Sequence, residues 1–207
     1  MRPYYVSLHL FDPLGPAQMA GAGTYGGEAR LFVHHAESLE QALGDVVEAI
    51  ADQGCRLLRI GHAGPAEAFL DEHFPFPADM QAMIDGSRDG ELVSSEAYSF
   101  EPWGVDTPSG VCAVVMDVYD PAMEGPEPYA GELVLATAPG TPEEALAELL
   151  EVLRDSNVRL KSLEDLRESA EASPDEYDDD WPLLELIAQA GSSGAPAFSP
   201  AFVYEAE

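Results

Sequence analysis

Apolar residues in the first half of the chain alternate between two spacings. Positions 4–11, 30–35 and 56–60 are short, mostly apolar runs, and they predict strands. Between the second and third runs, apolar side chains recur every three or four positions, as on one side of a helix. They are Leu39, Leu43, Val46, Val47 and Ile50. This half of the chain therefore begins with the order strand, strand, helix, strand.

The predicted helix is bounded by residue types that favour helix ends. Ser38 and Gln41 have the spacing of a capping box, in which the serine hydroxyl accepts from a backbone N–H three residues on. Gly54 follows the apolar stripe, and glycine adopts the left-handed backbone conformation without a steric penalty. We expect the helix to begin after Ser38 and to end at Gly54.

Beyond position 60 the pattern is less regular but still divides into elements. A helical turn is expected at 65–69 and a short helix at 78–85, which Gly86 ends. The aromatic stretch 91–101 predicts a closing strand. The first half of the chain therefore has the predicted order β-β-α-β-α-β.

The second half of the chain repeats the first half in order. Residues 141–146 match residues 38–43, and residues 156–160 match residues 53–57, each 103 positions later. The expected elements are strands at 111–119 and 132–137, a helix between Thr141 and Asn157 with a capping box at Thr141 and Glu144, a helical turn at 163–170, a helix at 182–190 ended by Gly191, and a strand at 201–205.

Self-similarity of this length predicts a tandem duplication of one domain. We expect residues 1–101 to form the first copy, residues 102–110 a linker and residues 111–207 the second copy. The repeated unit predicts an α/β fold, more narrowly an α+β sandwich, with a mixed or antiparallel sheet and helices mainly on one face. Two such copies would pack in a pseudo-twofold arrangement, so we expect a monomer.

The charge of the chain restricts its partners. It has 39 Asp and Glu against 9 Lys and Arg, a net charge of −30, and Lys161 is its only lysine. Nucleic acids and anionic membranes bind proteins through Lys and Arg, so neither is expected as a direct partner. A basic protein is the natural electrostatic complement. Solubility alone, or adaptation to high salt, is the competing explanation of the charge.

The compartment is inferred from the start of the chain and from its two cysteines. Residues 1–6 lack the apolar run of a signal peptide, and no segment is apolar enough to span a membrane. Cys55 and Cys112 occupy positions that do not match between the two halves, which argues against a structural disulfide. The sequence therefore predicts a reduced, cytoplasmic protein.

No motif for catalysis or for a cofactor is found. The glycines between positions 15 and 27 match neither pattern typical of nucleotide phosphate loops. None of the five histidines has the spacing of a metal site. They are His9, His34, His35, His62 and His73. We predict no enzyme, no cofactor and no local metal site; the alternative is a metal site assembled from His34 or His35 with carboxylates.

The densest acidic cluster is the candidate partner-binding site. Its residues are Asp175, Glu176, Tyr177, Asp178, Asp179, Asp180 and Trp181. The cluster lacks the glycine and distal glutamate of a calcium loop, and a solvated loop before a helix is the simpler interpretation. In the functional interpretation Trp181 anchors a basic partner and the aspartates steer it.

Three functions follow from these features. The preferred hypothesis is a non-enzymatic acidic binding protein that neutralises or chaperones a basic protein, as an immunity protein or antitoxin does. A nucleic-acid mimic is the second. The third is a small-molecule or metal-binding module with a site between the two copies, near a set of aromatic and histidine residues: Tyr5, Tyr25, Tyr119, Tyr129, His34 and His35.

Overall fold

The structure is a computed structural model, and it describes residues 1–15, 25–68, 77–101, 109–123, 129–173 and 182–205. The chain divides into two compact units, Met1–Gly104 and Val105–Glu207. Both units mix helices with antiparallel strands. Most of the predicted linker, 102–108, lies outside the described residues, so the predicted domain limits stay a prediction.

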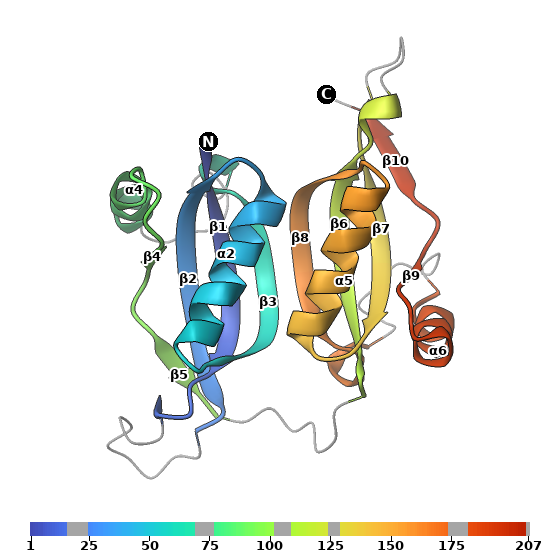
Figure 1. Cartoon of the computed structure of the whole chain (residues 1–207), viewed down its shortest axis with the longest axis horizontal. Coiled ribbons are helices and arrows are strands. Elements are labelled where there is room, and N and C mark those ends of the chain that lie inside the picture. Colours follow the sequence, from blue (N-terminus) through green and yellow to red (C-terminus); the bar gives the residue numbers. More distant parts are fainter. Residues whose placement is uncertain (16–24, 69–76, 102–108, 124–128, 174–181, 206–207) are drawn as a thin grey trace. The chain divides into compact units, whose positions relative to one another are not determined.

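The first unit is built on three long strands (Figure 1). Its described elements are β1 (Arg2–Phe11), β2 (Gly27–Ala36), α2 (Leu39–Asp52), β3 (Arg56–Pro65), α4 (Pro77–Gly86), β4 (Val93–Ser94) and β5 (Tyr98–Phe100). β1 is central and pairs with β2 on one side and β3 on the other. The short strands β4 and β5 both pair with the outer edge of β2. The described pairs are all antiparallel, one of the two arrangements that the sequence left open.

The second unit has a corresponding set of strands and helices. Its described elements are β6 (Val111–Tyr119), η1 (Pro121–Met123), β7 (Tyr129–Pro139), α5 (Pro142–Asp155), β8 (Arg159–Glu168), η2 (Ser169–Glu171), α6 (Leu183–Ser193), β9 (Ala197–Phe198) and β10 (Phe202–Glu205). β6 is central, between β7 and β8, and β9 and β10 pair with the outer edge of β7.

The helix starts lie where the capping residues predict them. The Thr141 hydroxyl accepts from the Glu144 N–H at 3.3 Å, and Glu144 Oε2 accepts from the Thr141 N–H at 2.8 Å, so α5 has a complete capping box. The Ser38 hydroxyl accepts from the Gln41 N–H at 3.2 Å. Gln41 Oε1, however, accepts from the Glu37 N–H, so α2 makes only half of the predicted box.

Three of the predicted helix ends are confirmed and one is wrong. α4 ends at Gly86, as predicted. Gly54 (φ +74°) and Asn157 (φ +57°) take the left-handed conformation two residues after the last residue of α2 and of α5. α6 continues through Gly191 and ends before Gly194, which has a φ of +67° and donates its N–H to the Ala190 carbonyl. The terminating glycine of α6 is therefore three residues later than predicted.

The helical turn predicted at 163–170 is a strand over most of its length. β8 continues to Glu168 and pairs with β6 as far as Cys112. Two irregularities interrupt this pairing, and Asp165 lies in β8 with a φ of +60°. Extra residues in a strand shift which side chains face the core. The buried leucines consequently recur every three positions, as in a helix: Leu160, Leu163 and Leu166.

The strands of each unit present two faces, defined here by the alternating side chains of the unit's central strand. In the first unit, Tyr4, Val6, Leu8 and Leu10 of β1 lie on the first face and are buried. Their neighbours Tyr5, Ser7, His9 and Phe11 lie on the second face, because successive side chains of a strand point to opposite sides. α2 crosses the three long strands and contacts all of them (Figure 1).

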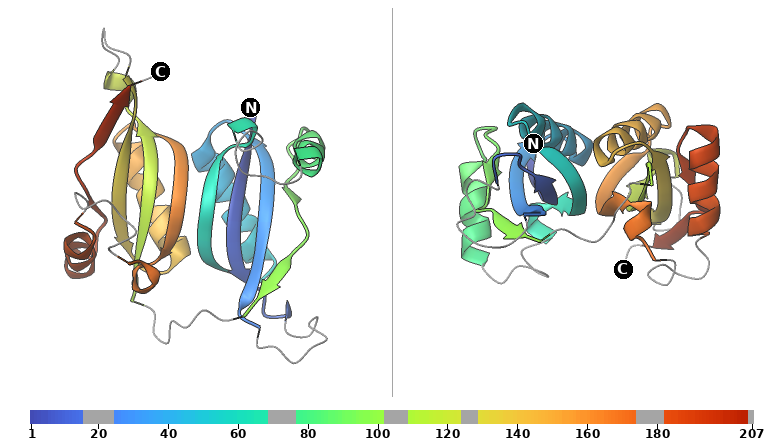
Figure 2. Two further views of the ribbon diagram at one scale, coloured as in Figure 1. Left: turned by 180° about the vertical axis from the view of Figure 1, so that it is seen from behind. Right: turned by 90° about the horizontal axis from the view of Figure 1, so that it is seen from below.

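The second face is covered by a second helix. Tyr5, Leu31 and Val33 form a buried cluster with Met80 and Ile84 of α4. Figure 2 shows α4 apart from α2, beyond the β2 edge. The expectation of helices mainly on one face is therefore not confirmed for this unit. The reason is that the run from Tyr4 to Val6 is buried on both faces, so the second face also needs a cover.

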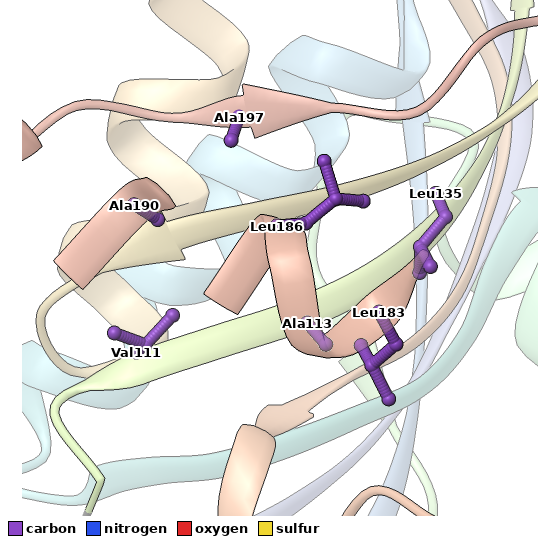
Figure 3. Close-up of a cluster of buried hydrophobic side chains, with 7 residues drawn as sticks. All are labelled: Val111, Ala113, Leu135, Leu183, Leu186, Ala190 and Ala197. Carbon is purple, nitrogen blue, oxygen red and sulfur yellow. The ribbon is translucent and has the colours of Figure 1, made fainter. Parts of the chain in front are cut away.

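The second unit buries its second face in a similar way. Strand residues meet α6 and β9 in a cluster of seven buried side chains, drawn in Figure 3: Val111, Ala113, Leu135, Leu183, Leu186, Ala190 and Ala197. The Thr137 hydroxyl is also buried there and donates to the Leu186 carbonyl at 3.0 Å. α6 is thus fixed by a hydrogen bond as well as by apolar packing.

Replacing Met80 tests whether the second face belongs to the core. Met80 is fully buried on the side of α4 that packs against the sheet, so Met80→Ala should lower the free energy of unfolding by about 2 to 5 kcal/mol. The exposed neighbour Gln81 is the control, and Gln81→Ala should change it by less than about 0.5 kcal/mol. Urea unfolding measures both. Equal, small effects would show that α4 does not pack on the sheet.

Candidate binding pocket

The acidic cluster predicted to bind a partner lies outside the described residues. It comprises Asp175, Glu176, Tyr177, Asp178, Asp179, Asp180 and Trp181. Its role in binding stays a prediction.

The two adjacent histidines do not share a site. His34 Nε2 lies 2.9 Å from Asp45 Oδ2 of α2, on the first face. His35 is the next residue along β2, so it points to the opposite face, where its Nδ1 lies 2.8 Å from the Ser87 hydroxyl. Within the described ranges, no three histidine, cysteine or acidic side chains are grouped as metal ligands.

Two of the tyrosines that we singled out, Tyr5 and Tyr25, form contacts within the first unit. The Tyr5 hydroxyl bonds His62 Nδ1, and the two ring centroids lie 5.3 Å apart. The Tyr25 hydroxyl accepts from the Asp12 N–H at 3.2 Å, and burial raises the Tyr25 pKa. Tyr119 lies at the end of β6, and the side chain of Tyr129 is outside the described set. Nothing in these contacts indicates a bound molecule.

A serine interrupts the edge of the first unit's sheet. The Ser95 N–H donates to the Leu31 carbonyl at 2.8 Å, and the Ser95 hydroxyl accepts from the Leu31 N–H at 3.0 Å. The chain then leaves β2 at Glu96 and returns at Tyr98, which pairs with Ala29. The interruption separates β4 from β5 and leaves an opening in the strand edge.

A pocket of about 570 Å³ lies at this opening. Its lining comes from β1, β2, α4 and the chain around β5: Ser7, Ala29, Arg30, Leu31, Asp79, Met83, Ser95, Glu96 and Tyr98. Asp79 and Met83 are four residues apart in α4, so they lie on the same side of that helix. Sequence reasoning missed the pocket, because its lining residues come from separate parts of the sequence and do not form one motif.

The pocket combines apolar walls with acidic groups. Leu31 is buried and Met83 half-buried, whereas Asp79 and Glu96 are exposed. Arg30 also lines the pocket, but its guanidinium forms an ion pair with Glu28. The charges left for a bound molecule are therefore negative.

The second unit has a matching serine but a different surface around it. The Ser199 N–H donates to the Leu135 carbonyl at 2.8 Å, and the Leu135 N–H donates to the Ser199 hydroxyl at 3.0 Å. Strand pairing then gives the equivalent positions. Ser7, Ala29, Glu96 and Tyr98 of the first unit correspond to Val115, Leu133, Pro200 and Phe202. The equivalent surface is apolar and lacks the carboxylate of Glu96.

A half-buried polar cluster on the second unit's second face was also missed by sequence reasoning. The Tyr204 hydroxyl donates to Asp117 Oδ2 at 2.6 Å. Lys161 Nζ donates to the Tyr204 hydroxyl at 2.5 Å and to the Ala130 carbonyl at 3.0 Å, and it lies 3.3 Å from Asp117 Oδ2. The three donors of this ammonium group are therefore all engaged. The only signal in the sequence was that Lys161 is the sole lysine.

These contacts give the Lys161 cluster a structural role. They connect β6, β8 and β10, so they hold the closing strand on the sheet. Although burial alone would lower the pKa of Lys161, the hydrogen bond to Tyr204 and the charge of Asp117 raise it overall. Burial raises the pKa of Tyr204. At the equivalent place in the first unit, His9 makes an edge contact with the Phe100 ring.

The cysteines offer no activated nucleophile. Both are free thiols. Burial raises the pKa of Cys112 to about 12, and burial also raises the pKa of Cys55. A thiolate is the reactive form of cysteine, so both shifts reduce reactivity at neutral pH.

Comparisons of the chain with models of protein families, with curated proteins and with solved structures find no match. Among the helices that the structure describes, none has the length and apolar character needed to cross a membrane.

The Lys161 cluster should make stability depend on pH in the alkaline range. Both raised pKa values favour the protonated groups in the folded state, so their contribution is complete below about pH 10 and is lost as the pH rises further. In the double variant Lys161→Met/Tyr204→Phe, the fall in thermal midpoint above about pH 10 should be shallower than in the native chain. Parallel curves for the two proteins would contradict this role. Tyr98→Phe, at an exposed position, is the control.

Proposed function

We propose that this chain is a non-enzymatic acidic binding protein that neutralises or chaperones a basic protein partner, in the manner of an immunity protein or antitoxin. The observation that carries the proposal is the net charge of −30 on a chain whose basic side chains are largely engaged with its own acids. The free thiols Cys55 and Cys112 support a cytoplasmic location, because reducing compartments keep cysteines unpaired.

The ion pairs within each unit support this proposal. Basic side chains form them with nearby acids: Arg30 with Glu28, Arg88 with Asp85, Arg154 with Glu151, Lys161 with Asp117, and Arg167 with Asp165. These pairs involve five of the nine basic residues, whereas the chain has 39 acidic residues. Most of its carboxylates are therefore available to attract a cationic surface.

Such a surface favours fast binding of a basic protein. Complementary charge steers two proteins together and raises the association rate more than it raises affinity. The same negative charge repels phosphates, which disfavours nucleic acids as direct partners. A nucleic-acid mimic would share this charge, but it would also displace duplex DNA from its target, so competition with DNA separates the two functions.

We further propose that the two units arose by tandem duplication. Support comes from hydrogen bonds that recur at equivalent positions. Leu31 with Ser95 and Leu135 with Ser199 make the same pair of bonds, at the same distances. Asp12 and Asp120 also make the same turn, each accepting a backbone N–H from two residues on at 2.8 Å.

Binding to a basic partner tests the proposed function. Basic proteins that the immobilised chain captures at low salt are identified and purified. The association rate of each purified protein with the chain is then measured. The association rate should fall steeply between about 10 and 150 mM salt, because the Debye length falls from about 30 Å to about 8 Å. An association rate that does not change with salt concentration would contradict electrostatic steering of the partner. A chain that captures no basic protein would contradict the proposed function.

The acidic cluster can be tested in the same assay. Asp178→Asn/Asp179→Asn/Asp180→Asn should slow association and leave dissociation nearly unchanged, as is typical of steering charges. The matched control removes three exposed acids elsewhere: Glu48→Gln/Asp52→Asn/Glu91→Gln. Equal slowing by both variants would show that net charge acts without a local site at 178–180.

A further inference from the structure

We propose that the pocket of the first unit binds one arginine side chain of the basic partner, with the guanidinium held by Asp79 and Glu96. This inference rests on the proposed function and assigns it a specific contact. The pocket volume, about 570 Å³, lies within the range typical of ligand sites. An arginine side chain occupies part of this space and leaves room for the backbone of the segment that carries it.

The walls of the pocket match the two ends of an arginine side chain. Leu31 and Met83 provide apolar surface for the methylene stem, as long cationic side chains require. Tyr98 is 70% exposed beside them. A guanidinium group is planar and stacks on aromatic rings, which favours arginine over lysine at this position.

The charges of the pocket match the guanidinium group. Asp79 comes from α4 and Glu96 from the chain between β4 and β5, so the two carboxylates lie on separate elements that line one pocket. The ion pairs among the described residues leave both carboxylates without a basic partner. Hydrogen bonds between a guanidinium and a carboxylate are among the strongest in proteins.

The second unit provides an internal comparison. At its equivalent surface, Pro200 takes the place of Glu96 and Phe202 the place of Tyr98. Leu133 and Val115 replace the small residues Ala29 and Ser7. This surface has no counterpart of the Glu96 carboxylate to hold a guanidinium. The arginine site therefore belongs to the first unit alone.

Binding of acetyl-arginine amide to the full chain, followed by NMR, tests the inference. We expect a dissociation constant on the order of 1 mM, as is typical of so small a ligand, with shifts at the Met83 methyl and the Tyr98 ring. Acetyl-citrulline amide has nearly the same shape without the charge, and it should cause no saturable shift. Equal binding of both compounds, or shifts confined to the second unit, would overturn the inference.

Paired variants define the contribution of the carboxylates. Asp79→Asn/Glu96→Gln should weaken binding of acetyl-arginine amide about tenfold, since it removes charge-assisted hydrogen bonds. Glu48→Gln/Asp52→Asn changes net charge equally on the exposed side of α2 and should leave binding within about twofold. Tyr98→Ala should also weaken binding of acetyl-arginine amide. Because the Tyr98 side chain is exposed, this substitution should leave the fold unchanged. Equal effects of the two double variants would overturn the inference.

The failure of this inference is distinguishable from the failure of the proposed function. A chain that binds a basic protein in a salt-dependent manner, equally well with and without Asp79 and Glu96, overturns the arginine pocket and leaves the function standing. A chain that binds no basic protein at low salt overturns the proposed function itself, and with it the assigned contact.

Discussion

Burial of both faces of the central strand is the constraint on which the first unit depends. Tyr4 and Tyr5 are neighbours in β1 and point to opposite sides, yet each is only 3% exposed. A single helix can cover only one side of a sheet. α2 covers the face of Tyr4, and α4 packs against Tyr5 through Met80 and Ile84. In the second unit, β6 is covered in the same way, by α5 on one face and by α6 on the other.

The pocket is a consequence of how the second face is covered. α4 packs over Tyr5, while the edge of β2 beside it is broken where Ser95 interrupts the outer strands. The second unit keeps the interruption at Ser199 but surrounds it with Leu133 and Phe202. Equivalent backbones therefore carry surfaces of different chemistry, and function must be argued from the side chains.

Local features of the sequence predicted the helices well, because caps act over three or four residues. Thr141 and Asn157 marked the ends of α5 without tertiary information. Strand length was harder to predict, since irregular pairing gave Leu163 and Leu166 a helix-like spacing. The pocket and the Lys161 cluster were not predictable, because each joins residues from separate elements that only the folded sheet brings together.

A crystal structure of the chain with a bound arginine-containing peptide would show whether the pocket of the first unit is an arginine site. We expect an arginine in the first unit, with its stem against Leu31 and Met83 and its guanidinium within hydrogen-bond distance of Asp79 and Glu96. The equivalent surface at Leu133 should be free of peptide. An arginine bound elsewhere, with this pocket closed by the chain's own side chains, would show that the pocket is not an arginine site.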